Sequence, residues 1–353
     1  MHLDILQQPE DMTETAVQFK RVHNKLGTLG VTISSTAMNK ADQEERSDNA
    51  ALQELLGHLY SVDYKFVTVS PVTHAIVNCR PSSVVARSLT DVFGWSRPFG
   101  SGLLPTALHE SLSKSGAVVE HEGLWLSRVR VSSIGDLLFI HSAFPTLDPQ
   151  AVFFGPDTYR FCRAISSHIH SSSLPRSMLD IGCGTGAGGI IGASSGIPRV
   201  RFSDINDDAL AFAELNATAA GLTDVEFVHS DLFDNLPGNY DLIAANPPYL
   251  NDSLHRAYRH GGGAFGSALS VRIAHEAITR LAPGGSLLLY TGAPIVDGKS
   301  PLKEELRCAF DASVRWTYEE IDPDVFGDEL ETDAYGSVDR IAAVLIIATM
   351  TGK

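Results

Sequence analysis

The sequence predicts an α/β protein in which a parallel sheet is covered by helices on both faces, preceded by a smaller α+β module. After Pro145, stretches typical of strands and stretches typical of helices alternate along the chain. A glycine-rich turn follows the first of these strands, and an acidic residue stands at the end of each of the next two. Such alternation builds parallel sheets, and polar residues at successive strand ends indicate a ligand site along one edge.

The length of the chain favours more than one domain. It has 353 residues, which is more than one compact core usually contains. The composition changes near residue 46 and again near Pro145. We therefore predict a flexible lead at residues 1–46, an accessory α+β module for substrate recognition at 47–148, and a catalytic α/β domain at 149–353.

The lead is predicted to contain one short helix at residues 18–26 and then a polar, charged linker or surface loop at 34–49. A longer helix is expected to begin near Ser47 or Asp48, because both residue types are favourable N-caps. Apolar residues then follow at helical spacing. They are Leu52, Leu55, Leu56 and Leu59.

The accessory module combines short strand-like and helical runs. We expect strands at 65–69, 74–78, 117–120, 124–132 and 137–141, and helices at 83–93 and 106–113. Helices followed by a short ribbon of strands are typical of a small α+β module similar to a winged helix. The sequence leaves open whether this module selects a substrate or only packs on the rest of the protein and supports it.

The second half of the chain supplies the elements of the main sheet. Strands are predicted at 177–181, 200–203, 225–228, 240–245 and 286–290, and helices at 188–195, 207–220 and 271–281. The last helix is expected to stop before Pro283-Gly284-Gly285. Two further strands, at 314–319 and 340–347, would form a terminal antiparallel hairpin on the sheet.

The composition disfavours several classes of function. Acidic residues outnumber basic ones by 42 to 27, whereas binding to a phosphate backbone usually needs an excess of lysine and arginine, so nucleic acid is a disfavoured partner. The four cysteines have no metal-ligand spacing, and we expect reduced thiols and no metal site. No apolar run is long enough to span a membrane and no signal peptide is recognised, which favours the cytoplasm. The oligomeric state stays open.

The first candidate binding motif is the turn at residues 179–186, Leu-Asp-Ile-Gly-Cys-Gly-Thr-Gly. Glycines at 182, 184 and 186 allow a sharp turn and let a ligand approach the backbone. Asp180 stands near the end of the preceding strand. A tight turn without any ligand would carry the same glycines, so this motif alone is a weak signal. The predicted binding residues here are Asp180, Gly182, Gly184 and Gly186.

Acidic residues at the next two strand ends strengthen the prediction. Asp204 lies about twenty residues beyond the glycine turn, where a carboxylate can accept both hydroxyls of a ribose. Asp231 ends the third strand, where it can accept an adenine amino group. Ile205 and Leu232 follow these acids and are predicted to line the same pocket. Asp204 is equally well placed to cap the following helix, but the three strand ends together favour a bound ligand.

The most specific motif is Asn246-Pro247-Pro248-Tyr249 after the fourth strand. Two prolines remove backbone donors and stiffen the turn. The amide oxygen of Asn246 and the carbonyl oxygen of Pro247 can then both accept hydrogen bonds from one NH₂ group. Tyr249 can stack on a planar group from the other side. We therefore predict Asn246, Pro247 and Tyr249 as catalytic residues acting on a planar nitrogen.

With these motifs, residues 152–290 resemble the class I methyltransferases of the Asn-Pro-Pro-Tyr type, especially the HemK-like protein glutamine N5-methyltransferases. The donor loop of that family matches 180–186, its ribose and adenine acids match Asp204 and Asp231, and its catalytic motif matches 246–249. The residues at 154–158 are similar to its Pro-Asp-Thr segment, and those at 261–263 to its glycine-rich loop. The substrate-pocket residues are then Phe154, Asp157, Thr158 and Pro248.

The resemblance implies a Rossmann-like, seven-stranded sheet, S-adenosyl-L-methionine as the methyl donor, and N-methylation as the reaction. The acceptor would be an amide, guanidine or amine of an amino-acid-like small molecule, or a protein glutamine. Family members that modify release factors have a shorter, helical leader, and they carry an acid where this chain has Tyr159 and Arg160. These differences make a small molecule a serious competitor to a release factor.

Two alternatives stay open from the sequence. The same motif occurs in adenine or guanine N-methyltransferases of nucleic acid, and the same fold occurs in non-methylating homologues such as cyclases that cleave the donor. Methyl transfer is an in-line displacement that depends mainly on positioning. Whether a base is needed cannot be read from the residues. The candidates are His255, His260, Asp157 and Tyr159, each of which also fits a surface or packing role.

Overall fold

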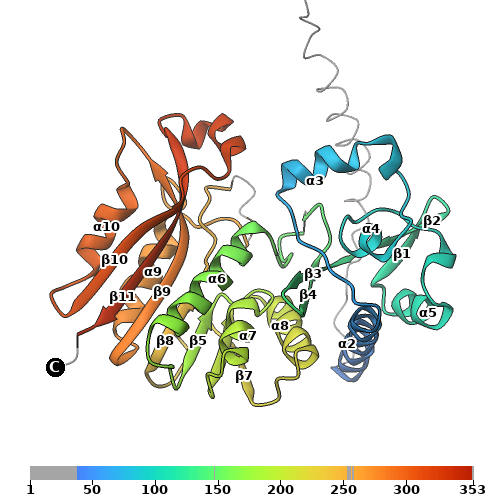
Figure 1. Ribbon diagram of the computed structural model, residues 1–353, viewed down its shortest axis with the longest axis horizontal. Coiled ribbons are helices and arrows are strands. Elements are labelled where there is room, and N and C mark those ends of the chain that lie inside the picture. Colours follow the sequence, from blue (N-terminus) through green and yellow to red (C-terminus); the bar gives the residue numbers. More distant parts are fainter. Residues whose placement is uncertain (1–37, 147, 253–255, 257, 352–353) are drawn as a thin grey trace, which may run out of the picture. The chain divides into compact units, whose positions relative to one another are not determined.

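The computed structural model describes residues 38–146, 148–252, 256 and 258–351 (Figure 1). Residues 45–353 form one compact unit by their contacts. Most of the predicted lead, including the helix expected at 18–26, lies outside the described residues. The predicted division at residue 148 stays a prediction.

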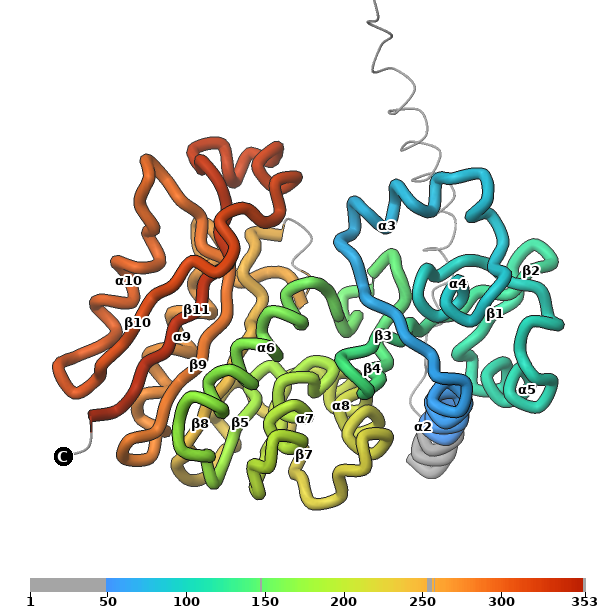
Figure 2. The backbone as a smooth tube through the Cα atoms, viewed as in Figure 1, coloured from blue at the N-terminus to red at the C-terminus, as the bar shows by residue number. Residues whose placement is uncertain are grey.

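A seven-stranded sheet forms the α/β part, in the order β10-β11-β9-β8-β5-β6-β7. The five strands from β9 to β7 pair in parallel, whereas β11 pairs antiparallel with both β9 and β10. Figure 2 shows β9, β10 and β11 side by side. The predicted α/β fold class and the antiparallel end of the sheet are therefore confirmed. The strands are β5 (Met178–Ile181), β6 (Val200–Asp204), β7 (Val225–His229), β8 (Tyr240–Ala245), β9 (Leu281–Ile295), β10 (Val314–Asp322) and β11 (Arg340–Met350).

Helices cover both faces of this sheet. Because side chains alternate along a strand, Met178 of β5 faces one layer while Leu179 and Ile181 face the other. The first layer holds α6, α7 and α8, and the second holds α9 and α10. These helices are α6 (Pro156–Ser171), α7 (Ala187–Ser194), α8 (Asp207–Ala219), α9 (Ala268–Ile278) and α10 (Pro301–Ala309).

The α+β part has a core of its own, formed by helices and two separate two-stranded sheets. All four leucines predicted for the first helix are buried in this core. Leu215 of α8 also packs into it, so the packing continues from this part to the main sheet. The elements are α2 (Met38–Ser61), α3 (Pro71–Asn78), α4 (Leu89–Phe93), α5 (Thr106–Lys114), β1 (Val118–His121), β2 (Leu124–Ser127), β3 (Val129–Ile134) and β4 (Leu137–Ser142).

Several predictions for the first ninety residues were wrong. The helix α2 begins at Met38, so the linker expected at 34–49 is helical from that residue onward, and Ser47 and Asp48 are not its start. Six of the seven residues at 40–46 are lysine, alanine, glutamine, glutamate or arginine, which are good helix formers; the exception is Asp42. The residues at 74–78 form helix α3 instead of a strand, because Ser70 caps the backbone N–H of Thr73 and Pro71 occupies the first turn.

Other corrections concern where elements begin and end. Residues 65–69 form no strand, although Phe66 exchanges hydrogen bonds with Ser133. The helix expected at 83–93 is reduced to α4, which Ser88 caps through the N–H of Asp91. The strand expected at 124–132 is divided at Arg128 into β2, which pairs with β1, and β3, which pairs with β4. Helices α6 and α10 were not predicted, and β9 begins at Leu281, five residues earlier than expected.

Candidate functional site

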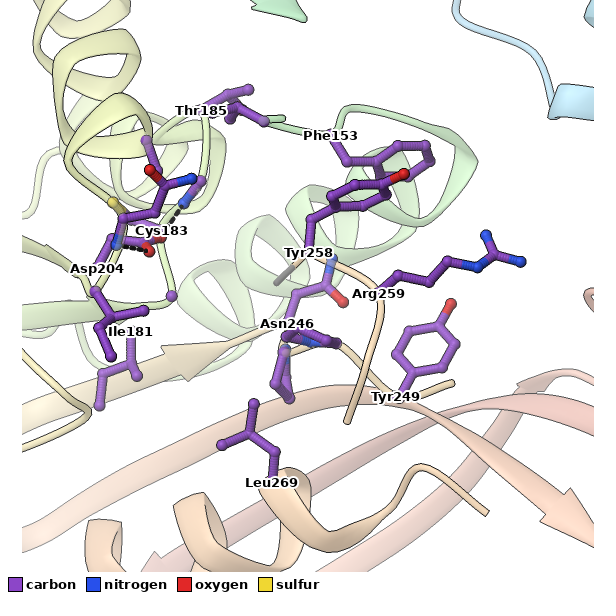
Figure 3. A pocket seen from close by; sticks show the side chains of 18 of the residues that line it. Phe153, Ile181, Cys183, Thr185, Asp204, Asn246, Tyr249, Tyr258, Arg259 and Leu269 are labelled. Carbon is purple, nitrogen blue, oxygen red and sulfur yellow. Dashed lines mark hydrogen bonds between the residues drawn. The ribbon is translucent and has the colours of Figure 1, made fainter. Parts of the chain in front are cut away.

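A cavity of about 390 Å³ opens where the carboxyl ends of β5, β6 and β8 meet the loops that follow them (Figure 3). Ligand sites in open α/β sheets lie at this edge. The structure brings most of the predicted site residues to the wall of this one cavity. They are Asp157, Thr158, Gly182, Gly184, Asp204, Ile205, Asp231, Leu232, Asn246, Pro247, Pro248 and Tyr249.

The glycine turn forms one end of the cavity. Gly182 and Gly184 have φ angles of 61° and 53°, in the left-handed region that a side chain rarely adopts. A Cβ at either position would meet no protein atom within 4 Å, so the bare backbone leaves open space for a ligand. Gly184 donates a 2.9 Å hydrogen bond to Oδ2 of Asp204. This hydrogen bond joins the glycine turn directly to the end of β6.

Asp204 is half-buried beside this turn, and its other oxygen, Oδ1, accepts a 3.0 Å hydrogen bond from the backbone N–H of Asn206. Burial raises the pKa of the Asp204 carboxyl, while these backbone N–H groups oppose the shift. The carboxylate is therefore already oriented by the protein. Figure 3 shows it across the cavity from Tyr249 and Arg259, with Asn246 between them.

Asp231 lies at the rim and forms an ion pair that sequence reasoning missed. Its Oδ1 is 3.1 Å from Nη1 of Arg272 in α9, and both side chains are nearly half exposed. Arg272 is also paired with Glu276, one helical turn further along. Asp231 and Arg272 are 41 residues apart, so no local pattern signals the pair.

The Asn-Pro-Pro-Tyr motif follows β8 directly and forms the far wall. Tyr249 is buried, and its hydroxyl donates a 2.8 Å hydrogen bond to Oδ2 of Asp157. The predicted glycine-rich loop packs against the motif, since a Cβ at Gly261 or Gly266 would overlap the backbone carbonyl oxygens of Pro248 or Tyr249. The loop therefore has to be free of side chains at these points.

Asp157 lies in the first turn of α6, and Tyr290 of β9 and Arg160 also contact it. Its neighbour Thr158 accepts a hydrogen bond from the backbone N–H of Gly155, which fixes the start of the helix. The proline, aspartate and threonine singled out in the sequence thus mark a helix N-terminus at the cavity.

Three predicted site residues do not line the cavity. Asp180 is fully buried and accepts a hydrogen bond from the backbone N–H of Gly189, and Gly186 is the N-cap residue of helix α7. Phe154 lies behind the wall, stacked on His141 with ring centroids 5.2 Å apart. Phe153, one position earlier, lines the cavity instead.

Sequence reasoning also missed the aromatic pair at the mouth. The rings of Phe153 and Tyr258 stack with centroids 6.0 Å apart, as Figure 3 shows. The hydroxyl of Tyr258 donates to the carbonyl oxygen of Thr146. Arg259 lines the cavity beside them and is paired with Glu329. The sequence signalled this aromatic pair only through Phe153, which stands next to the predicted pocket residue Phe154.

The four candidate bases have different positions. His255 lies outside the described residues, and His260 is half-buried and is not part of the cavity wall. The hydroxyl of Tyr159 accepts a 2.9 Å hydrogen bond from the backbone N–H of Thr68, away from the cavity. Only Asp157 lines it.

The described part of the chain contains no group of three or more histidine, cysteine, aspartate or glutamate residues that could hold a metal ion. Within the same residues, no helix is long and apolar enough to cross a membrane.

The sheet order, the glycine turn and the asparagine motif at the end of β8 define a class I methyltransferase fold. Comparison with known families agrees, because residues 161–310 match the family described as the methyltransferase small domain. The resemblance inferred from the sequence motifs is therefore confirmed for this part of the chain.

The similar proteins match only part of the chain. A release factor glutamine methyltransferase of Deinococcus radiodurans is 35% identical over 41% of this chain and 55% of its own length. A putative protein N5-glutamine methyltransferase of Methanocaldococcus jannaschii is 34% identical over 31% of this chain and 58% of its own. A ribosomal RNA small subunit methyltransferase C of Pasteurella multocida is 36% identical over 33% of this chain and 32% of its own. The chain thus spans about half the length of the first two relatives.

Proposed function

We propose that this protein is an S-adenosyl-L-methionine-dependent N-methyltransferase. One observation carries the proposal: the motif at 246–249 lies in the same cavity as the glycine turn and Asp204. The cavity volume of about 390 Å³ falls within the range of small-ligand sites. Donor-binding residues and acceptor-binding residues would then face each other across one enclosed space.

The residues present fit the donor. The bare backbone at Gly182 and Gly184 offers a cradle for its amino-acid portion, and Asp204 offers carboxylate oxygens to the ribose hydroxyls. Asp231, which is paired with Arg272 at the rim, would accept the adenine amino group. The donor supplies an activated methyl group on a positively charged sulfur.

The protein's own contribution is to hold and polarise the acceptor nitrogen. The amide oxygen of Asn246 and the carbonyl oxygen of Pro247 accept hydrogen bonds from its two hydrogens, which aims the lone pair at the donor. The same two acceptors stabilise the positive charge that develops on nitrogen, the kind of preorganised stabilisation that dominates many enzymes. The ring of Tyr249 forms the flat wall beside the acceptor.

For the acceptor, we propose the side-chain amide of a protein glutamine or of an amino-acid-like small molecule. Two of the relatives are named as glutamine methyltransferases, which supports an amide. A third is named as a ribosomal RNA methyltransferase, so the acidic composition is no ground for excluding nucleic acid. RNA therefore stays as the second candidate acceptor.

Donor binding is tested first, by calorimetric titration with S-adenosylhomocysteine. We expect the unaltered protein to bind it and Asp204→Ala to bind it at least about tenfold more weakly, because a hydrogen bond to a charged group contributes about 1.5–3 kcal/mol. If S-adenosylhomocysteine did not bind to the unaltered protein, the proposal would be rejected.

The acceptor is tested with a donor that carries a labelled methyl group. It is offered in parallel to free glutamine, to release factor and ribosomal protein preparations, and to ribosomal RNA. Label in a glutamine side chain supports the first candidate, and label in RNA supports the second. Consumption of the donor without transfer would favour the non-methylating alternative.

A further inference from the structure

Tyr249 is held by residues that lie far from it in the sequence. Its hydroxyl donates to Oδ2 of Asp157 at 2.8 Å, and the residue as a whole is only 7% exposed although it lines the cavity. Burial raises the pKa of the tyrosine hydroxyl well above its usual range, and the neighbouring carboxylate adds to this effect. The hydroxyl thus remains a donor committed to Asp157, and the ring is what the residue offers to the cavity.

Asp157 has little capacity left for chemistry. Its second oxygen, Oδ1, accepts a hydrogen bond from Tyr290 and lies 3.1 Å from Nη1 of Arg160. Arg160 is itself fixed by an ion pair of 2.6 Å with Asp322 of β10. Both carboxylate oxygens are therefore engaged, and the side chain is almost completely buried. This arrangement suits an anchor better than a general base.

The back of the Tyr249 ring is fixed in a different way. The ring lies directly on the backbone of Gly292 in β9, where a Cβ would overlap its Cδ2, Cε2 and Cγ atoms. Phe326 contacts the ring edge-on, with centroids 5.8 Å apart. The position of the ring therefore depends on the absence of a side chain at residue 292 as well as on the hydrogen bond to Asp157.

We propose that Asp157 and Gly292 are positioning residues, which act through Tyr249 to set the width of the slot that receives the flat acceptor group. The proposal rests on the proposed function. Asp157, a base candidate from the sequence, then takes no proton from the acceptor. Gly292 was not recognised in the sequence, because nothing local distinguishes it from any other strand glycine.

The role of Asp157 is tested by methyl transfer to a glutamine-containing peptide and to ribosomal RNA, using whichever of the two the unaltered protein methylates. We expect Asp157→Ala to lower kcat/KM by about ten- to a hundredfold, as for loss of a hydrogen bond to a charged group. Asp157→Asn should keep clearly more activity than Asp157→Ala, since its amide oxygen still accepts from Tyr249 and the hydroxyl of Tyr290 can turn to accept from its NH₂ group. In a Tyr249→Phe background, Asp157→Ala should cause little further loss, because both changes remove the same contact.

The placement of the Tyr249 ring can also be measured without any methyl acceptor. Fluorine NMR of protein labelled with 3-fluorotyrosine reports each of the nine tyrosines, and the Tyr249 signal is assigned by its loss in Tyr249→Phe. We expect that signal to shift or broaden in Asp157→Ala and in Gly292→Ala. The matched control is Tyr318→Phe, which removes a tyrosine hydroxyl bonded to Ser300 at 2.8 Å and should alter neither the Tyr249 signal nor turnover.

The outcomes separate this proposal from the proposed function. Failure of S-adenosylhomocysteine to bind the unaltered protein rejects the methyltransferase, while the NMR signals still test the placement of the ring. An Asp157→Asn protein that binds S-adenosylhomocysteine normally but is as inactive as Asp157→Ala would overturn the positioning role in favour of a base. A Tyr249 signal unchanged in both Asp157→Ala and Gly292→Ala would overturn it as well.

Discussion

The polar side chains of the cavity are oriented by the protein itself. Asp204 is held by backbone N–H groups of Gly184 and Asn206, and Tyr249 is held by Asp157. Groups that are fixed in advance need not reorganise when charge develops, which is the main source of their catalytic effect. At the scale of single residues, this fixed geometry suits the proposed in-line methyl transfer, which depends mainly on positioning.

Asn246 gives the sharpest test at this scale. Replacing it with alanine removes one of the two acceptors that we propose for the target nitrogen, and losing such a preorganised group typically lowers turnover about a hundredfold to a thousandfold. We expect Asn246→Ala to bind S-adenosylhomocysteine almost normally and to have almost no activity, while Asn246→Asp retains part of it. Steady-state kinetics with labelled donor and calorimetry provide the two measurements.

The control for Asn246→Ala is Asn239→Ala, since Asn239 is exposed and lies just before β8. This change should leave both turnover and affinity for S-adenosylhomocysteine unchanged. If Asn246→Ala turned over at the unaltered rate, the motif would be only a rigid turn and the mechanism would be wrong.

At the scale of elements, the glycine turn depends on how closely α7 approaches β5. Asp180 of β5 is 1% exposed and accepts a 2.7 Å hydrogen bond from the backbone N–H of Gly189 in α7. A Cβ at Gly188 would lie 2.9 Å from Oδ2 of Asp180, so glycine is needed for this approach. The predicted cofactor residue Asp180 therefore lies beneath the turn and supports it from behind.

The burial of Asp180 in this contact predicts that the stability of the protein depends on pH. Burial raises the pKa of Asp180 to about 8, far above its usual value near 4. Between these values the folded protein keeps a proton that the unfolded chain has lost, so this residue makes stability fall as the pH rises from 5 to 8. Asp180→Asn cannot lose a proton, and its melting temperature should fall less over that range.

Thermal unfolding at pH 5, 6.5 and 8 checks this prediction. The exposed Asp234→Asn variant serves as the control and should show the same pH dependence as the unaltered protein. Equal slopes for Asp180→Asn and the unaltered protein would contradict the prediction.

At the scale of the whole described unit, one buried side chain links the α+β part to the glycine turn at one end of the cavity. Asn216 of α8 accepts a 2.8 Å hydrogen bond from the backbone N–H of Ile140 and donates 3.0 Å bonds to the carbonyl oxygens of Ile140 and Thr185. The side-chain amide of Asn216 thus satisfies both backbone groups of Ile140 in β4. It also bonds to Thr185 in the glycine turn. The α+β part is a structural neighbour of the site as well as a candidate for substrate recognition.

Asn216→Leu tests this link. The change leaves three buried backbone groups without a partner, at about 1–3 kcal/mol each, so the free energy of unfolding should fall by roughly 3 kcal/mol or more. Affinity for S-adenosylhomocysteine should fall too, because the carbonyl of Thr185 loses its donor. Urea denaturation and calorimetry measure the two effects.

Gln53→Leu provides a graded control, since Gln53 donates only one hydrogen bond, of 2.9 Å, to the carbonyl of Leu215. It should cost less stability than Asn216→Leu and leave ligand affinity unchanged. Equal losses in the two variants would show that the link to the glycine turn is unimportant.

The sequence by itself determined those features that local patterns encode. The strand predicted at 240–245 matches β8 residue for residue, and strands β5 to β7 differ from prediction by one residue at either end. Glycines in the turn at 182–186, acids at strand ends and the motif at 246–249 each carry a local signal, because strand, turn and helix propensities act over a few residues. The sheet then brings these ends together.

Only the tertiary structure decided which residues support these motifs. Asp157 and Tyr249 are 92 residues apart, and Asp231 and Arg272 are 41 apart, so no short-range pattern pairs them. Whether Phe153 or Phe154 faces the cavity depends on how the chain enters α6, where a shift of one residue exchanges the exposed and buried sides. Contacts between distant segments are fixed by packing of the complete sheet and its helices, which the sequence specifies only as a whole.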